Sequence, residues 1–273
     1  MQGLGNDYVY LICMDQLPEE MTTLARRISD RNFGIGGDGM VVITSSKCAD
    51  FRMIMFNNDG SQAQMCGNAS RCIAKLVYEK GLTHKKEFTL ETLAGIKTLT
   101  LNFEGDEIKN ISVNMGKPFL LASEIPVRTG RIEDDLTSHE VNVGGKLLKI
   151  HCVGMGNPHG VIFESVGDVY FNEYGSQLEH HEIWPEKANI EFVKVISPHE
   201  IEMRVWERGT GETLACGTGA CASAVAAIKC GLVENDVNVI MKGGTLNIKL
   251  NERGEVIMTG DAVHVATGIY FDR

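Results

Sequence analysis

The two halves of this sequence resemble each other at an offset of about 150 residues. MCGN at residues 65–68 matches ACGT at residues 215–218, and GIKTLTLN at residues 95–102 matches GTLNIKLN at residues 244–251. The match needs no gap from residue 50 to residue 82. Such a repeat predicts two copies of one structural unit, and it constrains the fold more strongly than any single motif does.

Each half is expected to contain the same elements in the same order. A strand, at residues 51–56 or 201–206, runs into a loop that carries a cysteine. A helix then begins and ends near Gly81 or Gly231, where glycine suits a helix C-cap. Alternating apolar and polar residues predict further strands after each helix. We therefore predict an α+β fold of two pseudo-symmetric domains, each a curved, mostly antiparallel sheet or barrel around a central helix.

The repeat also predicts the domain bounds. We expect an N-terminal domain over residues 1–115 and a C-terminal domain over residues 116–257. The boundary is expected within residues 115–118. The last segment, residues 258–273, is expected to rejoin the first domain through a strand at 263–271.

Composition excludes several classes of protein. The 273 residues are 43% hydrophobic and 23% charged, as in a globular protein with a sizeable core. The net charge of −10 is dispersed, which argues against nucleic acid as a partner. No apolar run approaches the roughly 20 residues that span a bilayer. Because Asn6 and Asp7 lie where a signal peptide would be apolar, we expect a cytoplasmic protein.

The chain has eight cysteines, and none lies in a C-x-x-C pair. This spacing disfavours a zinc ribbon or a thioredoxin-like centre. In a long chain without an export signal, cysteines are more often reduced thiols than disulfides. Cys66 and Cys216 differ from the other six because they are equivalent in the repeat, and each lies just before a predicted helix. For the remaining six, burial in the core is the preferred interpretation.

Two equivalent cysteines suit stereoinversion. If the two domains face one another about an approximate two-fold axis, Cys66 and Cys216 approach a substrate from opposite sides. Inversion at Cα needs one group to remove a proton from one face and another to return a proton to the other face. A cysteine pKa of ~8.5 is lowered toward neutrality by a helix N-terminus. We therefore predict an amino-acid racemase or epimerase that uses a thiolate/thiol pair, with no cofactor and no metal.

The first turn of each predicted helix supplies backbone donors beside the cysteine. The N–H groups of Gly67, Asn68, Gly217 and Thr218 are expected to hold the substrate α-carboxylate, since first-turn amides lack acceptors within a helix. Negative charge that develops during proton abstraction then meets preorganised donors.

The motifs around these residues resemble those of the diaminopimelate epimerase family, in family order and over essentially the whole chain. The matching segments are GLGND (3–7), GIGGDG (34–39), NNDG (57–60), MCGN (65–68), GNPH (156–159), EKAN (186–189), ERGTGET (207–213) and ACGTG (215–219). The resemblance implies interconversion of LL- and meso-diaminopimelate in lysine and peptidoglycan-precursor biosynthesis. It also implies a homodimer and a small-molecule amino-acid substrate.

The resemblance further implies the roles of individual residues. Cys66 and Cys216 would shuttle the proton, and Glu207 would face the reacting amino group. His159 would bind Glu207 or the substrate. The distal end of the substrate would be held by Asn6, Asn57, Asn157, Asn189 and Arg208. Gly39 departs from the pattern, because some members carry a polar, substrate-contacting side chain there.

Other interpretations stay open at this point. A racemase of the same superfamily would act on histidine, proline or hydroxyproline. A thiol-rich binding or redox-sensing protein would have no isotope-exchange activity. A metal site made of four thiolates would use Cys66, Cys72, Cys216 and Cys221. The glycine-rich segment 34–39 lacks the Walker residues and the Rossmann spacing, so a plain turn is favoured over a phosphate loop.

Overall fold

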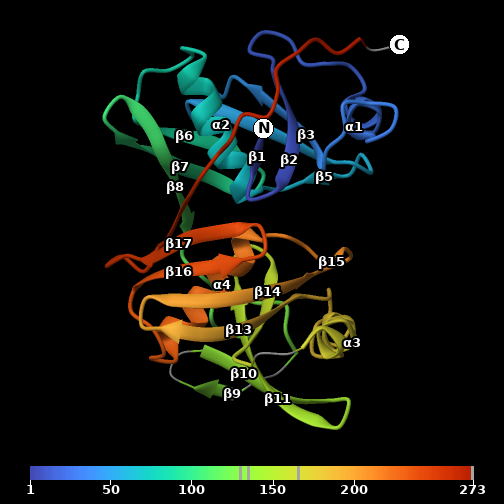
Figure 1. Ribbon diagram of the computed structural model, residues 1–273, viewed down its shortest axis with the longest axis vertical. Helices are drawn as coiled ribbons and strands as arrows, with labels where there is room; N and C mark the ends of the chain where they lie inside the picture. Colours follow the sequence, from blue (N-terminus) through green and yellow to red (C-terminus); the bar gives the residue numbers. More distant parts are fainter. Residues whose placement is uncertain (129–130, 134–135, 165–166, 272–273) are drawn as a thin grey trace. The chain divides into compact units, whose positions relative to one another are not determined.

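The computed structural model describes residues 1–128, 131–133, 136–164 and 167–271 (Figure 1). The chain divides into two compact units. Unit 1 comprises Met1–Asn114 and Thr259–Arg273, and unit 2 comprises Met115–Met258. Within the described ranges, no helix combines the length and the apolarity needed to cross a membrane.

The sheet of unit 1 is mostly antiparallel. Its strands follow the order β2-β3-β4-β6-β7-β8, and the pairs β2–β3 and β4–β6 are parallel. The short strands β1 and β5 pair with β2 and β4. The bounds are β1 (Gln2–Gly3), β2 (Asn6–Ile12), β3 (Gly39–Thr44), β4 (Phe51–Asn57), β5 (Gln62–Ala63), β6 (Glu87–Thr92), β7 (Gly95–Glu104) and β8 (Glu107–Gly116).

Unit 2 repeats this topology. Its strands follow the order β9-β10-β11-β12-β13-β14-β16-β17, with β12–β13 and β14–β16 parallel and β15 paired to β14. The bounds are β9 (Arg131–Glu133), β10 (Leu136–Val143), β11 (Lys146–Gly154), β12 (Pro158–Ile162), β13 (Asn189–Ser197), β14 (Glu200–Glu207), β15 (Gly211–Glu212), β16 (Asp236–Met241) and β17 (Gly244–Leu250). The predicted α+β class with mostly antiparallel sheets is confirmed.

A central helix follows the cysteine in each unit, as predicted. Helix α2 (Gly67–Glu79) is capped at its start by Cys66, and α4 (Gly217–Lys229) by Cys216. Gly81 and Gly231 follow the two helix ends with φ of 69° and 66°, the left-handed conformation that glycine adopts without steric cost. Helix α4 is rich in Ala and Gly and packs against six strands, β11 to β14, β16 and β17, which shows that the sheet curves around it.

Two further helices were not predicted. Helix α1 (Met21–Ser29) packs on β2, β3 and β4, and α3 (Asp168–Glu179) packs on β10, β13, β14 and β15. Neither has a side-chain cap at its start, and α3 contains Gly175, so the local helix signals are weak. A Cβ at Gly175 would lie 2.8 Å from the Trp206 ring, so packing on that ring requires the glycine.

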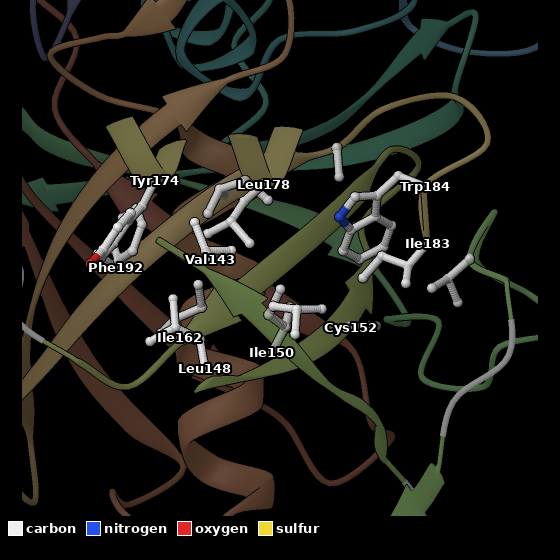
Figure 2. Close-up of a cluster of buried hydrophobic side chains, with 14 of the residues drawn as sticks. Val143, Leu148, Ile150, Cys152, Ile162, Tyr174, Leu178, Ile183, Trp184 and Phe192 are labelled. Atoms are coloured by element: carbon white, nitrogen blue, oxygen red, sulfur yellow. The ribbon is translucent and has the colours of Figure 1, made fainter. Parts of the chain in front are cut away.

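One hydrophobic cluster of unit 2 lies between α3 and the sheet (Figure 2). Tyr174 and Leu178 of α3 pack with Ile150 of β11, Phe192 of β13 and the Trp184 ring. In unit 1, a corresponding cluster joins Leu24 and Ile28 of α1 to Met40 and Val42 of β3. The second helix therefore covers the outer face of each sheet.

The predicted C-terminal strand at 263–271 is wrong. Among the described residues, the last strand is β18 (Val256–Gly260), and beyond it Val263 alone forms a bridge, with Gln2. The reason is that β1 offers only two residues as a partner edge. The segment nevertheless packs on unit 1, where Tyr270 lies against the α1 cluster. Residues 272 and 273, the end of the predicted C-terminal segment 258–273, lie outside the described residues.

Candidate active site

The unit 1 half-site is built around Cys66. This residue is extended, with φ −139° and ψ 124°, and its carbonyl accepts from Ser70 N at 2.9 Å as the helix begins. Its Sγ donates to Asn6 Oδ1 at 3.3 Å. Asn68 Nδ2 donates to the same oxygen at 3.4 Å. Three of the predicted site residues therefore meet at one atom of Asn6.

The Arg71 side chain holds Asn68 of this half-site in place through a hydrogen bond. Its side chain is fully buried, Nη2 donates to Asn68 Oδ1 at 2.9 Å, and Nε donates to the Asp261 carbonyl at 3.0 Å. Burial lowers the pKa of Arg71, while the neighbouring Cys72 and Cys66 thiols act in the opposite direction. A buried cation thus lies beside Cys66, although the sequence analysis did not single out Arg71.

Asn57 and Gly39 lie at the adjoining strand ends of unit 1. Asn57 Nδ2 donates to Ser61 Oγ at 3.0 Å in the turn between β4 and β5. Gly39 pairs with Asn57 across β3 and β4, and a Cβ at Gly39 would lie 2.0 Å from the Phe56 carbonyl oxygen. This position has no room for a side chain, which accounts for the glycine there.

The unit 2 half-site is built around Cys216, which is buried. Its Sγ accepts from Gly219 N at 3.4 Å and lies 3.5 Å from Thr218 Oγ1. Burial raises the pKa of the Cys216 thiol well above its ordinary value, and the carboxylates of Glu207 and Glu191 raise it further. The sequence predicted a lowered pKa from the helix N-terminus. For Cys216 this is wrong, because desolvation and two carboxylates outweigh the helix end.

Glu207 lies at the end of β14, beside Cys216. Its Oε1 accepts a short hydrogen bond from the Thr213 hydroxyl. Burial raises the pKa of Glu207, and hydrogen bonds from Thr213 and from the Cys216 thiol oppose this shift. The charge of Glu207 in turn raises the pKa of the Cys216 thiol, so ionisation of one group disfavours ionisation of the other.

His159 contacts a different carboxylate from the one predicted. Its Nδ1 lies 2.7 Å from Glu191 Oε1, and its Nε2 lies 3.0 Å from Asn157 Oδ1. Both His159 and Glu191 are fully buried. The sequence analysis expected Glu207 or the substrate as the partner. The register of β12 and β13, in which His159 is opposite Asn189, instead brings Glu191 beside the imidazole.

Asn189 and Arg208 form a separate pair within unit 2. Asn189 Oδ1 accepts from the Arg208 backbone N at 2.8 Å. The Arg208 side chain is exposed, and its Nη1 donates to the Glu186 carbonyl at 3.0 Å. The guanidinium is thus tethered at one nitrogen and presents its other donors, as bidentate carboxylate binding requires.

The structure brings some of the predicted residues together within each unit: Asn6, Cys66 and Asn68 meet in unit 1, and Cys216, Thr218 and Glu207 lie together in unit 2. The hydrogen bonds of Asn57, Asn189 and Arg208 run to other groups. Four residues to which the sequence analysis gives no role support these contacts, namely Asp38, Arg71, Glu191 and Thr213. Asp38 lies in the glycine-rich segment 34–39 and Thr213 in the segment 207–213, both of which match the family motifs. Among the described residues, no group of three or more His, Cys, Asp or Glu side chains could hold a metal ion.

Comparison with known sequences gives consistent matches over nearly the whole chain. The family model for diaminopimelate epimerase matches residues 1–121 and 151–265. A diaminopimelate epimerase of Acetivibrio thermocellus is 47% identical over 270 residues, which cover 98% of this chain and 96% of the relative. One of Desulfovibrio desulfuricans is 48% identical over 277 residues, covering 99% and 96%. One of Methanococcus maripaludis is 45% identical, covering 98% and 97%.

Solved structures share the fold at low identity. A Bacillus anthracis phenazine biosynthesis protein of the PhzF family superposes with a TM-score of 0.67 at 20% identity, over 94% of this chain and 91% of that one. A hydroxyproline epimerase from Agrobacterium vitis superposes with a TM-score of 0.64 at 14% identity, over 95% and 86%. Similarity at this level of identity shows the fold alone.

Proposed function

Because the chain belongs to the diaminopimelate epimerase family, we propose that it inverts one Cα centre of diaminopimelate, interconverting the LL and meso isomers. The observation that carries the proposal is the equivalence of Cys66 and Cys216. Each cysteine is the N-cap residue of the central helix in its own unit, and the strands β2-β3-β4-β6-β7 of unit 1 correspond to β12-β13-β14-β16-β17 of unit 2. Equivalent groups in two pseudo-symmetric units suit a reaction that exchanges the two faces of one carbon.

The proposed reaction balances without a further reactant. The thiolate of one cysteine takes the Cα proton, so an S–H bond forms as the C–H bond breaks. The electron pair stays on the substrate, where charge spreads into the α-carboxylate. The thiol of the other cysteine then gives its proton to the opposite face and becomes the thiolate. Because one group starts as the thiolate and the other as the thiol, and the two exchange these states, the reaction can run in either direction.

The helix ends supply the stabilisation that such a weakly acidic proton needs. In this proposal the first-turn N–H groups of Gly67, Asn68, Gly217 and Thr218 hold the α-carboxylate, because first-turn amides lack acceptors within the helix. Donors that are fixed before reaction stabilise the developing negative charge without reorganising. Glu207, beside Cys216, suits the reacting ammonium group. The exposed guanidinium of Arg208 suits the distal carboxylate.

The remaining expectations form part of the same proposal. The family name implies a step in lysine biosynthesis, and we propose that the enzyme works in the cytoplasm as a homodimer. Sedimentation of the purified chain tests the dimer. Racemases for proline or hydroxyproline share only the fold at 14–15% identity, so no specific observation favours that alternative substrate.

Deuterium exchange tests the function directly. Reduced enzyme is incubated with LL-diaminopimelate in deuterium oxide, and deuterium at Cα and the meso isomer are followed by mass spectrometry and chromatography. We expect both signals with the wild type and neither with Cys66→Ala or Cys216→Ala. Cys152→Ala is the matched control, because that thiol lies in the β11 core and burial raises its pKa to about 12. A folded wild type that incorporates no deuterium would overturn the substrate assignment.

A further inference from the structure

The carboxamide of Asn6 lies between Cys66 and a carboxylate that the proposed mechanism does not use. Asn6 Nδ2 donates to Asp38 Oδ2 at 2.7 Å. On the other side, Asn6 Oδ1 accepts from Cys66 Sγ at 3.3 Å and from Asn68 Nδ2 at 3.4 Å. Asp38, Asn6 and Cys66 therefore form a continuous chain of hydrogen bonds within unit 1.

Asp38 determines which end of the carboxamide faces the thiol. An ionised carboxylate can only accept hydrogen bonds, so the NH₂ end of Asn6 must face Asp38. The oxygen of Asn6 must then face Cys66 and Asn68. The second donor, Asn68 Nδ2, agrees with this orientation. The two ends of an asparagine amide are otherwise interchangeable, so without Asp38 the orientation would not be determined.

The carboxylate of Asp38 is itself held in place. Its Oδ2 also accepts from the backbone N of Asp7 at 3.1 Å, and its own backbone N donates to the Asp7 carbonyl at 2.7 Å. Its Oδ1 accepts from Arg31 Nη2 at 3.0 Å. Arg31 also binds the Asp7 carboxylate through two nitrogens, at 3.1 and 2.7 Å. The carboxylates of Asp7 and Asp38 thus share one arginine, and of these two carboxylates it is Asp38 that accepts the hydrogen bond from the Asn6 side chain.

We propose that Asp38 is a positioning residue that holds the oxygen of Asn6 toward Cys66, so that this corner of the half-site accepts hydrogen bonds. In the free enzyme the Cys66 thiol donates to that oxygen. In the complex the oxygen is offered to a substrate ammonium group and repels a carboxylate. This inference rests on the proposed function, because it assigns the group of the amino-acid substrate that Asn6 receives.

The inference predicts the acid strength of Cys66. An acceptor that faces the thiol favours its protonated form, whereas an NH₂ group in the same place would favour the thiolate. Two other groups of unit 1 that interact electrostatically with Cys66 are the buried guanidinium of Arg71 and the hydroxyl of Tyr10. The hydrogen bonds of the Asp38 carboxylate run to Asn6, Asp7 and Arg31, so a change at residue 38 acts on Cys66 through Asn6.

The test compares three single variants. Asp38→Ala removes the anchor of Asn6. Asp38→Asn keeps this anchor, because its one amide oxygen can accept from both Asn6 Nδ2 and the backbone N of Asp7. The exposed Arg31 keeps its ion pair with the Asp7 carboxylate in this variant. Asp7→Ala is the matched control, since it removes the other carboxylate that Arg31 binds. For each variant, the rate of alkylation of Cys66 by iodoacetamide is measured against pH by peptide mass spectrometry.

We expect Asp38→Ala to lower the pH midpoint of Cys66 alkylation by about one unit and to raise the KM for the amino-acid substrate about tenfold. Asp38→Asn and Asp7→Ala should both stay near the wild type. If Asp38→Asn matches Asp38→Ala, the lost charge alone explains the effect and the inference is overturned. Equal midpoints in all three variants would also overturn it.

The same substitution is also made in the Asn6→Ala variant. This comparison separates the effect of Asp38 on Asn6 from any general effect of Asp38→Ala on folding, and it needs no substrate. In Asn6→Ala, the further change Asp38→Ala should not move the Cys66 midpoint, because the group that Asp38 orients is gone. An undiminished shift there would overturn the inference. Alkylation needs no substrate, so these outcomes judge Asp38 even if wild-type enzyme shows no exchange with diaminopimelate, a result that would overturn the proposed function alone.

Discussion

The imidazole of His159 and the carboxylate of Glu191 lie 2.7 Å apart, with both side chains fully buried. The second oxygen of Glu191, Oε2, has no hydrogen-bond partner in the part of the chain that the structure describes. A buried carboxylate with one unpartnered oxygen carries a large desolvation cost, which the contact with His159 offsets. The pair lies beside Cys216, whose thiol pKa the charge of Glu191 helps to raise.

We predict that Glu191→Ala destabilises the protein by about 3–5 kcal/mol, because it leaves His159 without its buried partner. Glu191→Gln keeps the shape and a hydrogen bond, so its cost should be about 1–3 kcal/mol. The shift in urea midpoint, followed by circular dichroism, measures both. Glu202→Ala, exposed on the adjacent strand β14, is the control and should change little. Equal midpoints for the Ala variants at 191 and 202 would contradict the prediction.

Gly219 is predicted to tolerate no side chain. A Cβ there would lie 2.8 Å from Glu191 Oε1 and 3.3 Å from Cys216 Sγ. Gly219→Ala should therefore push the carboxylate or the thiol aside, cost about 1–3 kcal/mol and reduce the deuterium-exchange rate at least tenfold. Gly268→Ala, which would add a Cβ with no heavy atom within 4 Å, should leave both measurements unchanged. Wild-type exchange in Gly219→Ala would show that the contact is not tight.

The reactivity of Cys216 should depend on Glu207. Burial raises the thiol pKa, and the neighbouring carboxylate raises it further because a negative charge disfavours the thiolate. Glu207→Gln removes that charge, so the pH midpoint for alkylation of Cys216 should fall by about one unit. Glu212→Gln is the matched control, since Glu212 is paired with Arg204 and Lys242 instead. A midpoint that rises or stays constant in Glu207→Gln would refute this assignment.

Arg71 should be needed for the stability of unit 1. Lysine cannot reach Asn68 and the Asp261 carbonyl together, so Arg71→Lys leaves buried polar groups unsatisfied. We expect a loss of about 2–4 kcal/mol by chemical denaturation, and faster hydrogen exchange in the segment after β18. Arg52→Lys is the comparison, because its ion pair with Glu91 is solvent-exposed, and it should cost under about 1 kcal/mol. Equal losses in the two variants would argue against this role for Arg71.

The sequence by itself determined the position of each cysteine relative to its helix. Local signals suffice there, since a Cys-Gly pair precedes each helix and a glycine with positive φ follows it. The repeat then predicted the shared order of strands, because an offset of about 150 residues relates whole elements. Local sequence therefore suffices to indicate candidate site residues inside these motifs.

Only the tertiary structure decided which carboxylate each polar side chain meets. Asp38 reaches Asn6, and Glu191 reaches His159, across the parallel pairs β2–β3 and β12–β13. Each of these parallel pairs is joined by a crossover through a helix, α1 or α3, that no strong local signal marks. Strand register brings such partners together, and register depends on packing against the core, which a local pattern does not encode. For the same reason the segment 263–271 does not form the expected strand, and its pairing is a single bridge between Val263 and Gln2 among the described residues.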